Sequence, residues 1–220
     1  GAVFNPENPQ GFIQNCLEDE VKGIVSTLSA QGGSLVPEFY FNYQGERVEY
    51  LCYTNEFYNL CVIQQPLLKQ HIESEIKDAI AGDVSTCFAN LVANYEIDGY
   101  DARLQSGRTD VELLPKRIVV SFADYILTVT KGETARHEGF SVVLNNNLYE
   151  LTSIANSIID WEANYGDAET TAYMTYYKDL KVEKRTQQDG TKIYIITDRN
   201  TEDMFQFASR SVAWPPGFSS

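Results

Sequence analysis

The sequence has few of the residues that most enzyme and metal sites use. It contains only two histidines, His71 and His137, and its four cysteines lie too far apart for the CxxC pairs of zinc and redox sites. The second histidine of an HExxH motif is missing, as are the GxSxG, Walker and GxGxxG patterns. We therefore expect no metal, no cofactor and no catalytic residue, and we predict that the protein is not an enzyme.

Basic residues and long apolar runs are also scarce. The chain has 17 basic against 31 acidic residues, a formal net charge of -14, which repels nucleic acid and anionic membranes. No apolar run approaches the roughly 18 residues of a membrane span, so we predict no transmembrane segment in this sequence. The sequence starts without methionine, and we expect a leader, a membrane anchor or a tag upstream; these alternatives stay open.

Helical spacing of apolar residues is clear in three places. The first helix begins at Asn8 or Pro9 and ends before the glycines 32 and 33, and the second begins after Pro66 and continues to about Tyr95. The third runs from Leu148 to about Tyr165, before Gly166. Cys16 and Cys87 lie on the apolar faces of the first two helices.

Strand patterns and turn signals fill the remaining chain. A hairpin is predicted from residues 39–43 and 47–53, and an antiparallel meander from short strands between residues 102 and 144. A second hairpin surrounds the Asp189-Gly190 turn, and residues 205–212 add a strand. The order indicates an α+β fold with antiparallel sheets and three principal helices. We expect a helix-hairpin-helix part with four cysteines at 1–99, and a sheet with one helix at 100–220, packed as one unit.

Four cysteines allow three disulfide pairings, and free thiols in a cytosolic protein are the alternative. Packing of the two helices favours Cys16 with Cys87, and a short fold-back after a strand favours Cys52 with Cys61. A disulfide-bonded N-terminal part would place the protein in an oxidising compartment, so we predict that it is extracellular or at the cell surface.

Aromatic residues are the main positive signal for function. The chain has 14 tyrosines and 11 phenylalanines, several of them in clusters. Tyrosine offers contact area with a polar tip and suits interfaces, although strands also favour it for internal packing. The predicted interface or ligand residues are Phe39, Tyr40, Tyr43, Tyr53, Phe57, Tyr58, Tyr173, Tyr176 and Tyr177.

Several segments together resemble anchored surface proteins of archaea of the DPANN group. These segments are FNPENPQGFIQNCL, SAQGGSL, YLCY, ELLPKRIVV, KGETARHEGF and the final WPPG, so the resemblance covers nearly the whole chain. In those proteins a pilin-like N-terminal anchor helix precedes the matching segment, and no activity is established for them. The resemblance implies an archaeal surface protein and assigns no functional residue; the anchor is missing from this sequence.

These observations predict an extracellular cell-surface protein with a structural or adhesive role, as in a filament or sheath. Its partner would be a second copy or another surface protein. The alternative is a monomeric ectodomain that binds a peptide or a glycan, and a further alternative is an unrecognised hydrolase. The hydrolase would need a carboxylate pair or His71, which Glu75 and Asp78 follow on what the sequence indicates is a solvated helix face.

Overall fold

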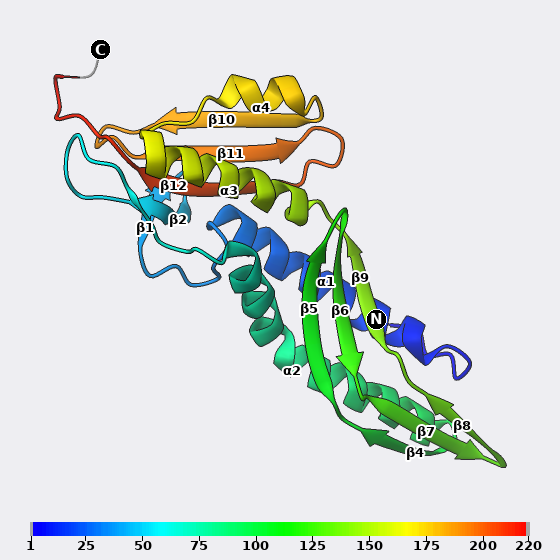
Figure 1. Ribbon diagram of the computed structural model, residues 1–220. Helices are drawn as coiled ribbons and strands as arrows, with labels where there is room; N and C mark the ends of the chain where they lie inside the picture. The colour runs from blue at the N-terminus through cyan, green and yellow to red at the C-terminus, as the bar shows by residue number, and fades with distance from the viewer. Residues whose placement is uncertain (1, 219–220) are drawn as a thin grey trace. The chain divides into compact units, whose positions relative to one another are not determined.

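The computed structural model describes residues 2–218 and shows the α+β fold that the sequence predicts (Figure 1). The three long helices are α1 (Pro9–Ala30), α2 (Leu68–Ile97) and α3 (Leu148–Tyr165). A fourth helix, α4 (Thr170–Tyr176), corrects the predicted number of three within the described residues. It has no buried residue, and so it lacks the apolar periodicity from which a helix is recognised.

The chain divides into two compact units. Unit 1 consists of Gly1–Val25 with Ile76–Asn145, and unit 2 consists of Ser26–Glu75 with Asn146–Ser220. These bounds differ from the division at residue 100 that we expected, because α1 and α2 each contribute residues to both units. The units are described separately below.

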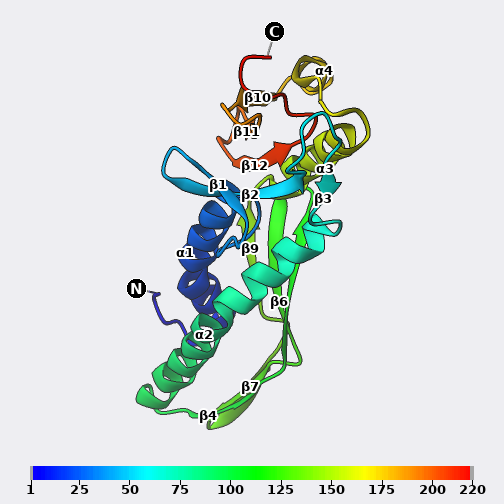
Figure 2. The ribbon, with the colours of Figure 1, turned by 90° about the vertical axis from the view of Figure 1, so that its left-hand side faces the viewer.

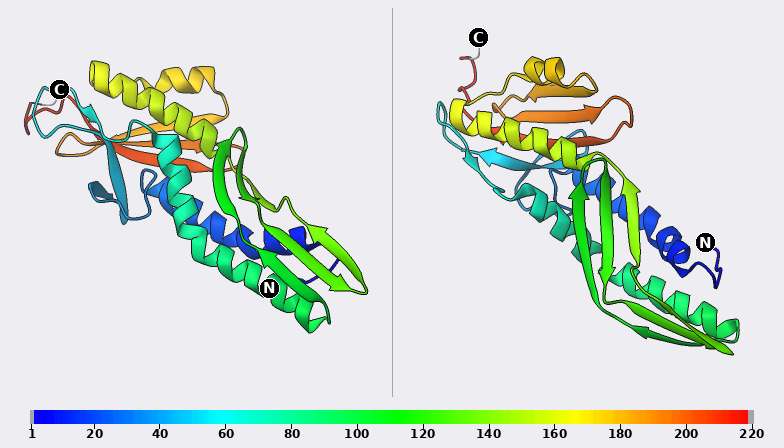
Figure 3. Two further views of the ribbon diagram at one scale, coloured as in Figure 1. Left: turned by 60° about the horizontal axis from the view of Figure 1, so that its bottom comes forward. Right: turned by 45° about the vertical axis from the view of Figure 1, so that its right-hand side comes forward.

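Unit 1 contains two three-stranded antiparallel sheets, which follow each other end to end (Figure 3). One has the order β4-β7-β8 and the other β5-β6-β9, so the strands do not form the single meander that we predicted. Strand β8 was not predicted, and His137 lies in it opposite Leu127. The strands are β4 (Asp101–Gln105), β5 (Arg108–Leu114), β6 (Arg117–Ala123), β7 (Ile126–Lys131), β8 (Glu133–His137) and β9 (Ser141–Asn145).

Two glutamines of α1 complete the hydrogen bonding of β9. Gln10 accepts a hydrogen bond from the Ser141 amide at 3.0 Å, and Gln14 accepts one from the Val143 amide at 3.0 Å. Each glutamine side chain also donates to the carbonyl oxygen of the same β9 residue. The helix therefore satisfies backbone groups that an edge strand would otherwise present to other chains.

Aromatic side chains and a disulfide hold the core of unit 1. Cys16 of α1 is joined to Cys87 of α2 across a Cα separation of 6.0 Å. The adjacent Phe88 packs edge-on against Phe122, with ring centres 5.2 Å apart. Tyr95 donates its hydroxyl to the Pro6 carbonyl at 2.7 Å, and burial raises the pKa of Tyr95 to about 12, so the hydroxyl remains a donor.

Unit 2 is a sheet with helices on one side. Its strand order is β1-β2-β12-β11-β10, with β3 also paired to β2, and its pairs are antiparallel except that β12 runs parallel to β2. Figure 2 shows α3 and α4 on the same side of this sheet, where α3 packs on β11 and β12 and α4 packs on β10. The strands are β1 (Tyr40–Tyr43), β2 (Glu46–Tyr53), β3 (Val62–Ile63), β10 (Leu180–Thr186), β11 (Lys192–Asp198) and β12 (Met204–Arg210).

Both predicted disulfides are present. Cys52 in β2 is joined to Cys61 before β3, with a Cα separation of 5.3 Å, and both cysteines are buried. The described helices include none with the length and apolar character that crossing a bilayer requires.

The two disulfides should contribute different amounts to stability, because they close loops of 71 and 9 residues. By loop entropy, replacing Cys16 and Cys87 with alanine should lower the free energy of unfolding by about 4 kcal/mol. Replacing Cys52 and Cys61 should lower it by about 3 kcal/mol. Denaturant titrations of both variants, beside the wild type with and without reductant, test this; equal stability of oxidised and reduced wild type would contradict it.

Candidate functional site

An aromatic groove lies at α3 and α4 in unit 2. Its volume is about 450 Å³, and most of its lining surface is apolar. The side chains of Trp161, Tyr176 and Tyr177 are 50%, 85% and 53% exposed, which is unusual for rings of this size. The groove residues are Ser157, Trp161, Glu169, Ala172, Tyr173, Tyr176 and Tyr177.

The sequence of α3 explains why Trp161 faces outward. The helix buries an apolar stripe that includes Leu151, Ile158 and Ile159, and this stripe faces the sheet. Trp161 lies outside the stripe, and its ring contacts at a tilt that of Tyr165, four residues later on the same helix side, with ring centres 4.8 Å apart. Trp161 lines the groove beside α4, whereas Tyr165 lines a different cavity.

Hydrogen bonds fix α4 next to this surface. The Glu169 side chain caps α4 by accepting from the Thr171 amide at 3.0 Å, and this bond lowers the pKa of Glu169, so the carboxylate is ionised at neutral pH. The hydroxyls of Tyr173 and Ser157 lie 2.7 Å apart and join α4 to α3. The groove is thus lined by the hydrogen bond between Ser157 and Tyr173 and by exposed aromatic rings.

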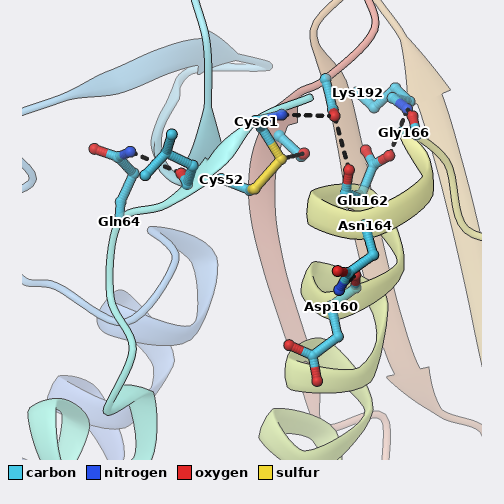
Figure 4. The surroundings of a disulfide bond; sticks show 11 residues. Cys52, Cys61, Gln64, Asp160, Glu162, Asn164, Gly166 and Lys192 are labelled. Carbon is cyan, nitrogen blue, oxygen red and sulfur yellow. Dashed lines mark hydrogen bonds and ion pairs between the residues drawn. A yellow bond between two sulfur atoms is a disulfide. The ribbon is translucent and has the colours of Figure 1, made fainter. Parts of the chain in front are cut away.

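A buried ion pair holds the end of α3 on the sheet. Lys192 at the start of β11 donates to Glu162 Oε2 at 2.6 Å and to the Gly166 carbonyl at 2.7 Å, and it lies 3.3 Å from Asp167 Oδ1. The Lys192 side chain is 10% exposed, and the Glu162 side chain is 0% exposed. Figure 4 shows Glu162 and Lys192 pointing toward each other, whereas Asp160 points away on the other side of the helix.

The carboxylates around Lys192 differ in their proton affinity. Burial raises the pKa of Glu162 and outweighs the opposing effect of Lys192. Burial also acts on Asp167, but its ion pairs with Lys184 and Lys192 outweigh this and lower the pKa of Asp167. Lys192 uses its three protons within the unit, so this cluster is a structural connection rather than a free cation.

The second disulfide is connected to the same helix end. The Cys61 amide donates to Ser211 Oγ at 2.9 Å, and Ser211 Oγ donates to the Glu162 carbonyl at 2.7 Å. Gly166, with φ 83°, ends α3 in the left-handed conformation that favours glycine, and its amide also donates to the Glu162 carbonyl. Glu162 of α3 is therefore connected, through Ser211 directly after β12, to the disulfide loop.

His71 and its neighbours form a separate polar cluster in unit 2. Ser34 Oγ donates to Glu49 at 2.6 Å and lies 2.8 Å from His71 Nε2, while Glu75 accepts from the Leu35 amide at 3.1 Å. Because the single hydroxyl proton of Ser34 is used on Glu49, His71 donates to Ser34 and does not act as a base toward it. The predicted solvated face around His71 is wrong in this part, since His71 and Glu75 hold the loop that follows α1.

The predicted residues of the first hairpin gather mainly on the sheet. Phe39 stacks on Tyr50 with ring centres 4.7 Å apart, and Tyr53 contacts Phe39 edge-on at 4.5 Å. Tyr43 packs against the same buried cluster, while Tyr40 lies under Arg47 with the guanidinium 5.7 Å from its ring centre. These side chains are largely engaged within unit 2.

The remaining predicted residues fall in two places. Phe57 lies under Arg210, 5.3 Å from its guanidinium, and Tyr58 contacts Trp214 with ring centres 5.1 Å apart. Tyr173, Tyr176 and Tyr177 come together in the groove.

Sequence reasoning missed Trp161, which lines the groove, and Tyr165, whose ring contacts it. Their spacing of four residues, outside the apolar stripe of a predicted helix, is a signal that could have found them.

Two other cavities are present. One of about 420 Å³ is lined by residues that include Lys192, Ser211 and Trp214, and one of about 680 Å³ lies in unit 1 beside Cys16 and Asn94. Across residues 2–218, His, Cys, Asp and Glu side chains form no group of three or more that could hold a metal ion. The α3–α4 groove brings three exposed rings, Trp161, Tyr176 and Tyr177, together with an ionised carboxylate. The cavity of about 420 Å³ has two exposed rings, Tyr165 and Trp214, so we take the groove as the candidate site.

Replacing Lys192 with methionine should destabilise unit 2 strongly. The variant leaves Glu162 buried without its cation, and breaking a buried pair in this way costs about 3–5 kcal/mol. Lys181→Met is the control, because Lys181 forms an exposed pair with Glu183 that is worth about 1 kcal/mol or less. Denaturant titrations measure both; equal losses of stability in the two variants would contradict the structural role of Lys192.

The pH dependence of stability should change in Glu49→Gln. Burial raises the pKa of Glu49, the Ser34 hydrogen bond opposes the rise, and the Glu75 and Glu38 carboxylates add to it. A raised pKa in the folded state stabilises the protein fully below the ordinary glutamate pKa of 4.5, and this contribution is lost as the pH rises through the folded pKa. The stability of the wild type relative to Glu49→Gln should therefore fall from acid to neutral pH. Urea titrations at several pH values measure both proteins. The same pH dependence of the free energy of unfolding in the wild type and in Glu49→Gln would contradict the prediction.

Comparison with protein families, with curated proteins and with solved structures found no match for this chain.

Proposed function

We propose that the protein is an extracellular adhesive protein that binds its partner through the α3–α4 groove and works by binding rather than by catalysis. The observation that carries this proposal is the exposure of Trp161, Tyr176 and Tyr177 around one concave surface. Tryptophan and tyrosine are the residues most enriched in the energetic centres of interfaces. Exposed rings gathered in one place commonly mark a binding site.

The disulfides support the extracellular part of the proposal. Cys52, Cys61 and Cys87 are buried and Cys16 is half-buried, and such structural disulfides form and persist mainly in oxidising compartments. The resemblance to surface proteins of DPANN archaea agrees with this location, and it adds an archaeal cell surface to the proposal. A membrane anchor upstream of the sequence belongs to the same proposal.

Assembly into a filament or sheath is the less favoured candidate. It would need sheet edges that can pair with a second copy. The edge strands β10 and β8 carry charges that oppose such pairing, whereas the edge strand β1, YFNY, carries none. Strand β10 contains Lys181, Lys184 and Arg185, and β8 contains Glu133 and Arg136. Contact through the aromatic groove needs no free edge, so adhesion through side chains fits the structure better.

The triple variant Trp161→Ala, Tyr176→Ala, Tyr177→Ala tests the proposal. It changes no charge, and it removes side chains that are largely exposed, so the fold should be retained, which circular dichroism can check. We expect the wild type to bind specific members of an array of oligosaccharides and peptides, with at least about tenfold weaker binding in the triple variant.

Trp214→Ala is the matched control. Trp214 is 53% exposed, close to the 50% of Trp161, but it lies outside the groove. Binding should survive this change. The proposal would be overturned if the triple variant still bound the array, or if the wild type bound no array member.

A further inference from the structure

We infer that the groove accepts a cationic side chain, arginine or lysine, presented by a partner protein. This inference rests on the proposed function and specifies the chemistry of the partner. The faces of aromatic rings carry negative potential, and tryptophan and tyrosine bind cations within about 6 Å of the ring centre. A cage of such rings with a carboxylate beside it is suited to a single positive group.

The groove supplies both parts of such a cage. Trp161, Tyr173, Tyr176 and Tyr177 provide the rings, and Glu169 provides a carboxylate among the lining residues. The Glu169 carboxylate is a stable anion, because the Thr171 amide donates to it at 3.0 Å. The Glu169 carboxylate would attract a cation that bound between the rings. This cation would displace no salt bridge, because none of the described residues forms one with Glu169.

A second carboxylate acts on the groove from α3. Burial raises the pKa of Tyr173, the hydrogen bond with Ser157 opposes the rise, and the charge of Asp160 adds to it. The negative field of Asp160 therefore reaches a ring that lines the groove. Like Glu169, Asp160 favours a cation there and disfavours an anion.

Two cations of unit 2 near this surface are already engaged, whereas Lys178, which follows Tyr177, is exposed and does not line the groove. Lys184 donates to Asp167 at 2.7 Å, and Arg199 donates to the Leu180 carbonyl at 3.2 Å. No Lys or Arg is among the groove residues, so within the described part of the chain its rings have no cation of their own there. The formal charge of -14 further draws cationic partners toward the protein and repels acidic ones.

Other rings in the chain already bind cations in this way. The Arg210 guanidinium lies 5.3 Å from the centre of the Phe57 ring, and Lys131 Nζ lies 5.0 Å from the centre of the Tyr100 ring. The groove offers rings of the same kind with space above them. Charge complementarity therefore favours a basic protein segment over an acidic glycan, and over a second copy of this acidic chain.

The test uses a fluorescent peptide with several arginines separated by glycine and serine, and the same peptide with citrulline in place of arginine. Citrulline keeps the size and the planar end group but removes the charge and has a carbonyl oxygen in place of one NH2 group. At physiological ionic strength the Debye length is about 8 Å, so attraction by the distant net charge is largely screened. Fluorescence anisotropy should show at least about tenfold tighter binding of the arginine peptide.

Three variants locate the binding. Trp161→Ala should weaken it about tenfold, and Tyr177→Leu should weaken it more than Tyr177→Phe, because phenylalanine retains the ring face that a cation contacts. Glu169→Gln should weaken it about threefold. Glu133→Gln in unit 1 removes the same charge from a residue that does not line the groove and should leave binding unchanged.

The outcomes separate this inference from the proposed function. Equal binding of the arginine and citrulline peptides, or arginine binding that Trp161→Ala leaves unchanged, would overturn the cationic assignment. Array binding of a neutral oligosaccharide that depends on Trp161, with no preference for the arginine peptide, would overturn it while the proposed adhesive function stands. If the wild type bound neither the peptides nor any array member, both would be rejected.

Discussion

The buried pair of Lys192 and Glu162 is the interaction on which the candidate site depends. It joins α3 to β11, and neither charge could remain in this position without the other. Trp161 directly precedes Glu162 in the chain. Glu162 points toward the sheet and holds α3 there, and Trp161 points away from the sheet and lines the groove. The pair therefore determines where the Trp161 ring stands relative to α4.

The two units stabilise their helices by different chemistry. In unit 1 a disulfide joins α1 to α2, and glutamine side chains of α1 complete the edge of β9. In unit 2 the disulfide closes a loop whose end reaches α3 through Cys61 and Ser211. Rigid support of this kind suits a binding surface, because rings that are held in place before binding lose little entropy when a partner arrives.

The sequence predicted the features that arise from local patterns. The apolar spacing placed the three long helices, and the faces of Cys16 and Cys87 led to the disulfide pairing that the structure confirms. It did not predict α4 or β8, because their mostly exposed residues give no apolar pattern, or the parallel pair of β12 with β2, which depends on contacts between distant segments. Tyr173, Tyr176 and Tyr177 could be selected by composition, but their grouping with Trp161 required the packing of α4 beside α3.

Native-state hydrogen exchange of α3 tests the central claim most directly, because it measures whether the helix opens apart from the sheet. If the buried pair and Ser211 fix the helix, the amides from Ile154 to Glu162 should open with the same free energy as the amides of β11 and β12. An α3 that exchanges through a separate and less costly opening, while β11 stays protected, would contradict a groove that is formed before its partner binds.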